Sequence, residues 1–384
     1  MTDLSRLPPL HQLNCAASSG SPPSGVVGFI GRRPAVVGTG LVALDVIYGL
    51  DQTRAPDLYA GGTCGNVLAA LAFLGWESYP IARLADDPAG RRVLRDLASC
   101  GVQTDFASLE PRRPTPIILQ RIRLDGEGQV VHRFATRCPS CGAFFPQYTP
   151  VPREPLAYVT SSLPSPEVVF VDRVSPSAVL LAETAYQNGA LIYFEPSAAC
   201  DARLVGRMLE VVHILKYSQE RAHLFARPSH ASVPLEIETR GPKGLRYRGT
   251  MFGRSGRAWR SLPGFAVSQL RDAAGAGDWM SAGLIDFVAQ AGAEGFEALP
   301  RDLIEDGLQT AQAYSAWACG FEGARGGMYR ESVGSVRDKV ARTLAAGVVD
   351  TVPVSANCAT PFDVLDELCG GCGPGPTAKH ASAG

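Results

Sequence analysis

The sequence lacks any apolar run that approaches the roughly 20 consecutive residues a membrane-spanning helix needs. Its first residues lack the basic head and continuous apolar segment of a secretory signal, so we expect a cytoplasmic protein with no membrane partner. An excess of either charge is also missing, because 36 Lys and Arg oppose 37 Asp and Glu, for a formal net charge of -1. This balance disfavours nucleic acid as a partner.

The composition changes along the chain. Residues 1–33 are rich in Pro, Ser and Gly, which predicts a disordered N-terminal tail. Residues 34–349 carry the periodic pattern of a folded domain, and residues 350–384 form a second, Pro-, Gly- and Ala-rich tail. A chain of 384 residues fits one large α/β domain with an insertion or appendage.

Short apolar runs alternate with helical patterns in the central region. Strands are expected at 34–40, 79–83, 168–174, 191–197 and 213–218, with helices at 65–75, 89–101, 177–189, 202–212, 278–292 and 301–320. This alternation predicts a mainly parallel sheet with helices on both faces and ligands at the carboxyl ends of its strands. Residues 117–134 surround a DGEG turn and predict a hairpin that could act as a flap. A Pro-rich link is expected at 146–166.

The segment RDAAGAGDWMSAGL places Gly275, Ala276 and Gly277 directly before a carboxylate, Asp278, at the start of an apolar helix. Small residues let an anion approach the unpaired N–H groups of a helix start. A carboxylate there would repel a phosphate, unless it serves as the base for an oxygen that attacks that phosphate. The alternative is an ordinary helix cap, with glycines that only turn the chain.

This segment resembles the C-terminal signature of the ribokinase-like family, the PfkB carbohydrate kinases. The stretch GGTCGNVLAALAFLGW is similar to the N-terminal signature of that family, and ARLADDPAGRRVLRDLASCGVQTDF is similar to the segment that follows it. The similarity in order and spacing covers roughly residues 34–330. It implies a three-layer α/β/α sandwich with a small β lid at about 112–150, ATP and Mg²⁺ as cofactors, and a homodimer contact through the lid.

The resemblance also implies roles for individual residues. Asp278 would be the catalytic base, with Gly275, Ala276 and Gly277 as the anion hole. The residues expected to contact the substrate are Asp45, Gly61, Gly62 and Asn66. Those expected to contact ATP are Lys216, Ser218, Thr239, Arg240, Gly241 and Gly244. Alternatives from the residues themselves are that Asp45 ends a strand, that Asn66 caps its own helix and that 241–244 is a plain hairpin turn.

The chain departs from the family pattern at several positions. The family's N-x-x-E motif reads Ser218 and Arg221 here, and Glu220 stands one residue early, which turns its carboxylate by about 100° on a helix. The Asp-Pro-Asn segment of the family reads Glu195-Pro196-Ser197, and Ala273 replaces the Thr of the C-terminal signature. These changes indicate a divergent member.

Ten cysteines are too few for a disulfide scaffold in a chain of this length, but four occur as close pairs. Cys138 and Cys141 lie in RCPSCGAFF, and Cys369 and Cys372 lie in CGGCG, both in the shape of a zinc knuckle. One structural Zn²⁺ held by all four would require the C-terminal segment to fold back onto the lid region. The alternatives are two unrelated pairs, a disulfide switch, or a metal held between subunits.

We therefore expect an ATP-dependent kinase that phosphorylates a hydroxymethyl group of a sugar. A nucleoside kinase of the same fold is the first alternative, with Phe134, Phe144, Phe145 and Tyr148 as an aromatic wall for the base. A non-catalytic ligand-binding or scaffold protein on the same fold is the second. The sequence does not identify the sugar or the position phosphorylated.

Overall fold

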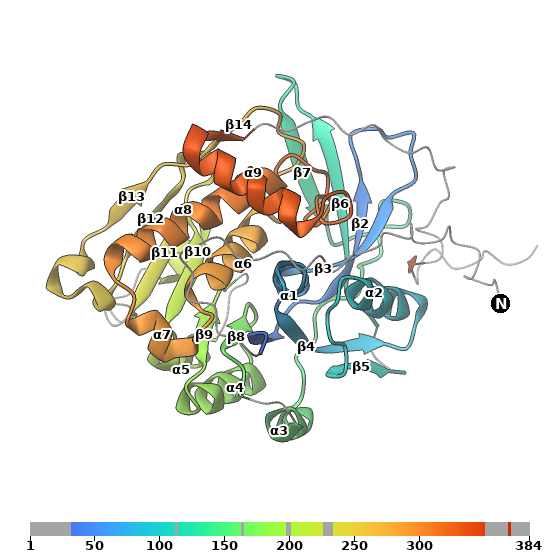
Figure 1. Ribbon diagram of the computed structural model, residues 1–384. Coiled ribbons are helices and arrows are strands. Elements are labelled where there is room, and N and C mark those ends of the chain that lie inside the picture. The colour runs from blue at the N-terminus through green and yellow to red at the C-terminus, as the bar shows by residue number, and fades with distance from the viewer. Residues whose placement is uncertain are drawn as a thin grey trace, which may run out of the picture.

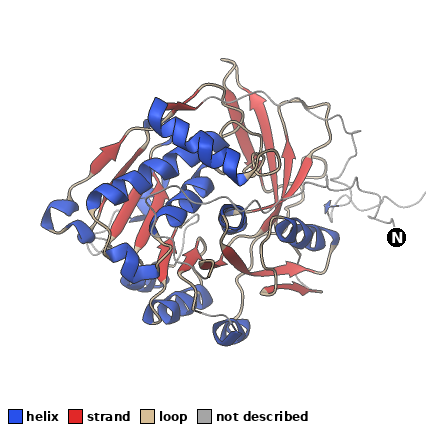
Figure 2. Cartoon of the chain, viewed as in Figure 1, coloured by secondary structure: helices blue, strands red, loops and turns tan. Residues whose placement is uncertain are grey.

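The structure is a computed structural model that describes residues 32–111, 114–162, 165–196, 201–225, 233–349 and 368–369. Figures 1 and 2 show a large sheet flanked by helices, with a smaller sheet beside it. Most of the two expected tails, and Cys372, lie outside the described residues. Within the described part of the chain, no helix combines the length and apolar character needed to cross a membrane.

The large sheet has nine strands in the order β13-β12-β11-β10-β9-β8-β1-β4-β5. The strands from β5 to β11 in this order are parallel, and β12 and β13 add an antiparallel edge. Their bounds are β1 Ala35–Thr39, β4 Glu77–Ala85, β5 Ala107–Glu110, β8 Val168–Val171, β9 Leu191–Phe194, β10 Ile214–Ser218, β11 Leu235–Thr239, β12 Leu245–Arg248 and β13 Arg260–Leu262. The predicted α/β fold is confirmed.

Helices cover both faces of this sheet. One face carries α1 (Thr63–Leu74), α6 (Ala276–Val288) and α8 (Arg301–Ala318), with α9 (Val333–Ala346) packed on α8. The other face carries α3 (Arg153–Ser162), α4 (Pro176–Gln187) and α5 (Ala202–Val211). Two further helices are α2 (Pro88–Ser99), packed against the smaller sheet, and α7 (Gly292–Glu297).

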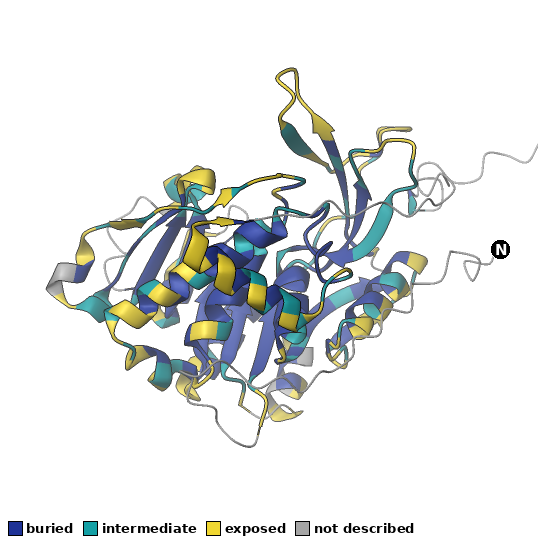
Figure 3. Cartoon of the chain, turned by 45° about the horizontal axis from the view of Figure 1, so that its top comes forward, coloured by how far each residue is buried: buried dark blue, intermediate teal, exposed yellow. Residues whose placement is uncertain are grey.

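Strands β8 and β9 are apolar throughout because both of their faces are covered. In β8, Phe170 packs into the core on the α6 side, and its neighbour Val171 packs into the core on the α4 side. Tyr193 and Phe194 of β9 divide in the same way, and all four side chains have no exposed surface. A parallel sheet between two helical layers accounts for such runs, and Figure 3 shows these strands buried along their length.

The smaller sheet has the order β3-β2-β6-β7, with bounds β3 Asp57–Gly61, β2 Ala43–Tyr48, β6 Ile117–Leu124 and β7 Val130–Ala135. The predicted hairpin is β6 and β7, which pair antiparallel and project with an exposed tip (Figure 3). The sequence pattern did not predict β2 and β3. The smaller sheet, called the lid sheet below, therefore contains two strands from residues 43–61 in addition to the predicted hairpin. A dimer contact through this sheet stays a prediction.

The predicted Pro-rich link at 146–166 is partly wrong, because it contains α3. Pro155 lies in the first turn of that helix, where a residue without an N–H group is tolerated. Leu156 and Val159, three positions apart, are both buried against the sheet, so one apolar face stabilises the helix. The pattern at 333–346, which forms α9, was also not recognised.

The strand order reverses between β8 and β1. Successive strands run outward from β8 to β11 on one side and from β1 to β5 on the other. Ligands of such sheets bind at the carboxyl ends of the strands beside this reversal. Short 3₁₀ segments lie near those ends, η2 (Gln219–Phe225) after β10 and η4 (Gly241–Lys243) after β11. Two more, η5 (Thr250–Phe252) and η6 (Arg254–Arg257), and a small parallel pair, β14 (Ala266–Val267) and β15 (Val348–Val349), complete the domain.

Candidate active site

The turn before α6 requires glycine for two reasons. Gly275 caps the helix in the left-handed region, at φ 76°, and a Cβ there would lie 2.3 Å from the Cβ of Ala324. Ala273 and Gly277 on the same turn are exposed. The N–H groups of a first helical turn have no partner inside the helix, so this turn offers donors and the positive end of the helix dipole to a ligand. The anion hole at Gly275, Ala276 and Gly277 stays a prediction that this geometry permits.

Asp278 lies in the first turn of α6 and contacts the other signature of the sequence. Its Oδ2 accepts a hydrogen bond from Nδ2 of Asn66 in α1, at 2.8 Å. Burial raises the pKa of Asp278 to about 8, and the negative charge of Glu195 adds to this rise. The Asn66 hydrogen bond and the positive charge of Lys216 oppose it. A carboxylate with a pKa close to neutral pH suits a general base.

A buried ion pair supports the turn from below. Nζ of Lys216 lies 2.6 Å from Oε1 of Glu195 and 2.8 Å from the carbonyl oxygen of Gly277. Only 1% of Lys216 is exposed. The hydroxyl of Ser281, one turn further along α6, donates to Oε2 of Glu195 and accepts from the Tyr193 hydroxyl. Lys216 therefore holds the turn in place in this structure, and its contact with ATP stays a prediction.

The paired glycines before α1 allow a carboxylate to lie against the backbone. A Cβ on Gly61 would lie 1.9 Å from Oδ2 of Asp45, and a Cβ on Gly62 would lie 2.4 Å from the carbonyl oxygen of Leu41. Gly62 also has φ 79° and bonds to Asp45 through its N–H. The next contact along this path is the hydrogen bond from the N–H of Asn66 to the carbonyl oxygen of Gly62. The predicted residues Asp45, Gly61, Gly62, Asn66 and Asp278 thus form one continuous path.

Two buried oxygens on this path have no hydrogen-bond partner among the described residues, Oδ1 of Asp45 and Oδ1 of Asn66. Buried acceptors are almost always paired, so these two atoms point to a ligand that donates hydrogen bonds, such as a hydroxyl. Burial raises the pKa of Asp45 to about 7, against the opposing positive charge of Arg325. Arg325 is itself buried in an ion pair with Asp96.

Sequence reasoning assigned no role to Asp172, which stands directly after β8. One of its oxygens accepts a hydrogen bond from the N–H of Leu41 at 2.9 Å, and a Cβ on Gly40 would lie 1.6 Å from that oxygen. Its charge adds to the raised pKa of Asp278. Its position directly after a buried strand could have marked it as a site residue, because ligands bind at the carboxyl ends of such strands.

Asp272 joins the lid sheet to the turn before α6. Its buried carboxylate accepts from Nε2 of Gln120 in β6 at 2.5 Å, and its Oδ1 lies 3.1 Å from Nδ1 of His132 in β7. The N–H groups of Ala274 and Gly323 donate to the same carboxylate at 2.9 and 3.0 Å. Asp272 therefore connects both strands of the hairpin to the turn that precedes α6. No local sequence pattern marks Gln120 or His132 for these contacts.

The expected ATP-side residues gather at the carboxyl ends of β10 and β11. Ser218 and Thr239 lie opposite each other in the parallel register of these strands. Arg240 follows Thr239 and is partly exposed. Gly241 and Gly244 bound the 3₁₀ turn before β12, both at positive φ, 56° and 85°. These backbone conformations explain the glycines, and their contact with ATP stays a prediction.

The displaced carboxylate of Glu220 is exposed at the end of β10. It accepts hydrogen bonds from its own backbone N–H and from the hydroxyl of Ser218, and both lower its pKa. Arg221 beside it is partly exposed. An exposed, ionised carboxylate next to the expected nucleotide site fits a divalent ion that is bound chiefly by ATP phosphates.

The four aromatic residues expected near the lid do not form one wall. Phe145 is 2% exposed and packs in the core, so its expected part in a wall is not supported. Phe144 is exposed but lies under the guanidinium of Arg137, 3.6 Å from its ring centroid. Phe134 on β7 is 57% exposed, and Tyr148 is partly buried with its pKa raised by burial and by Asp172. Of the four, Phe134 and Tyr148 remain available to contact a ligand.

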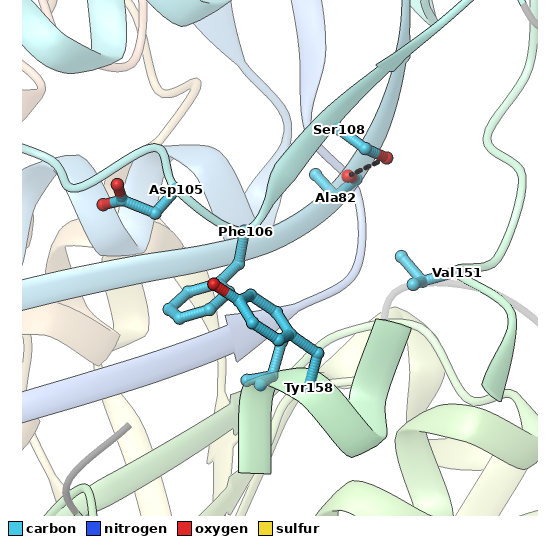
Figure 4. A pocket seen from close by; sticks show the side chains of 7 residues that line it. Ala82, Asp105, Phe106, Ser108, Val151 and Tyr158 are labelled. Carbon is cyan, nitrogen blue, oxygen red and sulfur yellow. Dashed lines mark hydrogen bonds between the residues drawn. The ribbon is translucent and has the colours of Figure 1, made fainter. Parts of the chain in front are cut away.

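A separate hollow lies at the edge of the large sheet, where β5 meets α3 (Figure 4). The ring of Tyr158 lies against that of Phe106, with centroids 6.0 Å apart, and the Ser108 hydroxyl donates to the carbonyl oxygen of Ala82. Asp105, Val151 and Val159 complete its lining. None of these residues belongs to the path from Asp45 to Asp278, so the hollow is distinct from the candidate site.

Comparison with solved structures gives the same fold at low identity. A fructokinase from Xylella fastidiosa with bound ATP is 20% identical with a TM-score of 0.62, over 81% of this chain and 99% of that one. Ribokinase from Arabidopsis thaliana, complexed with ribose and ATP, is 17% identical with a TM-score of 0.58, over 80% and 99%. A nucleoside kinase from Burkholderia thailandensis in complex with inosine is 18% identical with a TM-score of 0.57, over 82% and 98%.

No match was found among curated proteins. A profile described as pfkB family carbohydrate kinase matches residues 44–329. This range includes the glycine pair, Asn66 and the whole turn with Asp278, so the match and the geometry concern the same residues. The chain belongs to the pfkB family of carbohydrate kinases.

Proposed function

We propose that this protein transfers the γ-phosphoryl group of ATP to a hydroxymethyl group of a sugar. The observation that carries the proposal is the contact of Asn66 with Asp278, on a path that ends in two unpaired buried oxygens. A polyhydroxylated substrate supplies the donors that those oxygens require. Membership of a kinase family supports the phosphoryl donor.

In this mechanism Asp278 takes the proton from the attacking hydroxyl, and the oxygen then bonds to the γ-phosphorus as its bond to ADP breaks. Asp45 and Asn66 orient the sugar by accepting from its other hydroxyls. The N–H groups of the turn from Gly275 to Gly277 stabilise the charge on the transferred group. The Lys216–Glu195 pair fixes the position of that turn through the hydrogen bond of Lys216 to the Gly277 carbonyl oxygen.

Mg²⁺ would neutralise charge on the ATP phosphates, and the exposed carboxylate of Glu220, although one residue from the family position, is a candidate ligand for it. The lid sheet would close over the sugar and exclude water, and Asp272 would pass this closure to the turn.

The test is ATP consumption by the purified full chain against a panel of pentoses, hexoses and nucleosides. Each product is identified by mass spectrometry, so that ATP hydrolysis and phosphoryl transfer are told apart. The matched control is the Asp278→Asn variant, which keeps the shape of the site. The proposal requires a phosphorylated sugar that the variant makes at least about a hundredfold more slowly, and ATP hydrolysis alone would contradict it.

A nucleoside kinase is the second candidate, because exposed Phe134 and partly buried Tyr148 are available to stack on a base. Nucleosides turned over at least about tenfold faster than free pentoses would favour it, since one apolar contact of this kind is worth roughly 1–3 kcal/mol. Phe134→Ala should then reduce nucleoside turnover and leave any sugar activity unchanged.

A non-catalytic binding or scaffold protein is the third candidate, motivated by Ser218 and Arg221 in place of the usual metal-organising residues. In that case sugars would bind, as measured by calorimetry, without any ATP turnover. The exposed turn and the raised pKa of Asp278 favour a working kinase, since a binding protein gains nothing from a base in that position.

A further inference from the structure

Three cysteine thiols from distant parts of the chain meet outside the candidate active site. Cys138 and Cys141 follow β7, and Cys369 comes 228 positions after Cys141. Their three sulfur atoms all lie within 4.8 Å of one another. Residues 368 and 369, the short red segment in Figure 1, lie beside the smaller sheet.

The distance between two of these sulfurs is too long for a disulfide bond and allows both to bind one metal ion. Sγ of Cys141 lies 3.5 Å from Sγ of Cys369. A disulfide bond is about 2.05 Å long. Two thiolates that bind one tetrahedral zinc at about 2.3 Å each are separated by roughly 3.8 Å. The observed spacing is therefore close to that of shared metal ligands.

The turn that carries Cys138 and Cys141 is held in shape by its own contacts. The N–H of Gly142 donates to the carbonyl oxygen of Cys138 at 2.9 Å, and the N–H of Cys138 donates to that of Ala143 at 2.8 Å. Gly142 has φ 74°, a conformation that favours glycine. The side chain of Arg137 donates to the Gly142 carbonyl oxygen at 3.0 Å. A preformed turn reduces the entropy lost when a metal binds.

Burial makes the site closed on one side and open on the other. Cys138 is 2% exposed and Cys369 is 4% exposed, and both belong to the core cluster that contains Phe145. Leu368 packs against this cluster, whereas Cys141 is exposed. The metal thus has an entry path past Cys141, while two ligands are shielded from water.

We propose that Cys138, Cys141 and Cys369 bind one structural Zn²⁺ that fastens the C-terminal segment to the base of the lid hairpin. Cys372, which lies outside the described residues, stands three positions after Cys369 and is the expected fourth thiolate. Sulfur ligands select zinc over the hard Mg²⁺ ion of a kinase. Each ligating thiol releases one proton when the metal binds.

The position of the site indicates its effect. The chain runs from Cys138 through Phe145 to Pro146, whose carbonyl oxygen accepts from the N–H of Ile117 at the start of β6. Zinc therefore anchors the segment through which the hairpin joins the rest of the molecule. Loss of the zinc should lower the melting temperature and loosen the lid. The zinc takes no part in phosphoryl transfer itself.

The experiment measures zinc in the untagged full chain by mass spectrometry of the metal. We expect about one zinc per chain, and Cys141→Ser and Cys369→Ser should each lower retention at least tenfold. Cys100→Ser is the matched control, since Cys100 is a partly buried thiol outside the cluster and its loss should leave the zinc content unchanged. Because Cys141 is exposed, its variant should fold even if Cys369→Ser does not.

Cobalt gives a second readout that needs no enzyme activity. The chain refolded with Co²⁺ should show sulfur-to-cobalt charge-transfer bands and the intense visible bands of a tetrahedral site, and Cys141→Ser should weaken them. Zinc below about 0.1 per chain, with the cobalt bands absent, would overturn the proposal. A disulfide between Cys141 and Cys369, found by peptide mass spectrometry, would also overturn it in favour of a redox pair. These results are independent of whether the protein is a sugar kinase.

Discussion

Nδ2 of Asn66 lies 2.8 Å from Oδ2 of Asp278, although 212 positions separate the two residues. One residue comes from α1 and the other from α6, and these helices pack side by side on the large sheet. The contact joins the substrate half of the site to the catalytic half. It also gives Asn66 a task beyond the helix cap that its sequence context alone would suggest.

Asp278→Asn should lower turnover by about 10²–10⁴, because an amide cannot take the proton of the attacking hydroxyl. Substrate affinity should change little, since Asn keeps the size of the side chain and can still accept from Asn66. Steady-state kinetics gives the first quantity, and calorimetry of sugar binding gives the second. A variant with more than about a tenth of the normal turnover would rule out Asp278 as the base.

The rate should rise with pH, because the base must be ionised. The pKa of Asp278 is raised to about 8, so kcat/KM should increase up to tenfold per pH unit below that value and level off above it. Asn66→Ala removes a hydrogen bond that lowers this pKa, so its profile should move to higher pH. A profile that stays flat from about pH 6 to 9, or moves to lower pH in the variant, would contradict the assignment.

The same ionisation should weaken the fold. The pKa of Asp278 is about 8 in the folded chain against an ordinary value of 3.8, so the folded state binds more protons between these limits and stability falls as pH rises through them. Asp278→Asn removes this loss. Its melting temperature should exceed that of the natural chain by roughly 2–4 °C at pH 8, with a smaller gain at pH 5. An equal gain at both pH values would point to another cause.

Much of this site could be predicted from the sequence because the signatures report backbone geometry. Gly62 and Gly275 adopt positive φ and lie against neighbouring residues where a Cβ would clash, and a local sequence pattern records such requirements. The alternation of apolar runs likewise fixed the sheet and the helices on both faces.

Other contacts could not be predicted, because they depend on tertiary packing. The pairing of Asp272 with Gln120 and His132 joins residues about 140–150 positions apart, and nothing local to each marks it. The place of Lys216 under the turn depends on how β10 meets α6. The helix α3 was not predicted because the prolines of 146–166 indicate a loop, whereas the helix is marked only by Leu156 and Val159, three positions apart.

The glycine requirement at the turn can be measured with a matched pair. Gly275→Ala forces a Cβ to 2.3 Å from that of Ala324 at φ 76°, so we expect a loss of stability of about 1–3 kcal/mol and a loss of turnover. Gly206 is exposed inside α5, where a Cβ meets nothing within 4 Å. Gly206→Ala should therefore stabilise the chain by about 0.5–1 kcal/mol. Urea unfolding of both variants provides the comparison, and equal effects would contradict it.

The Lys216–Glu195 pair offers a test of what holds the turn. Both side chains are buried, with 2% and 8% exposed, so removing one leaves the other as an unpaired buried charge. Lys216→Met should therefore cost about 3–5 kcal/mol of stability, measured by urea unfolding. Adding Glu195→Gln should recover part of that loss, because the remaining buried group is then neutral.

Turnover should not recover with stability in the double variant. Without Lys216 the carbonyl oxygen of Gly277 loses its hydrogen bond from Nζ, and the turn that carries Asp278 loses this side-chain support. If Lys216 acts only through the ion pair, the double variant should regain stability and activity together. If it also positions the turn, as the 2.8 Å contact indicates, stability returns while kcat stays low and KM for the sugar stays nearly normal. That separation decides between a stabilising and a positioning role for Lys216.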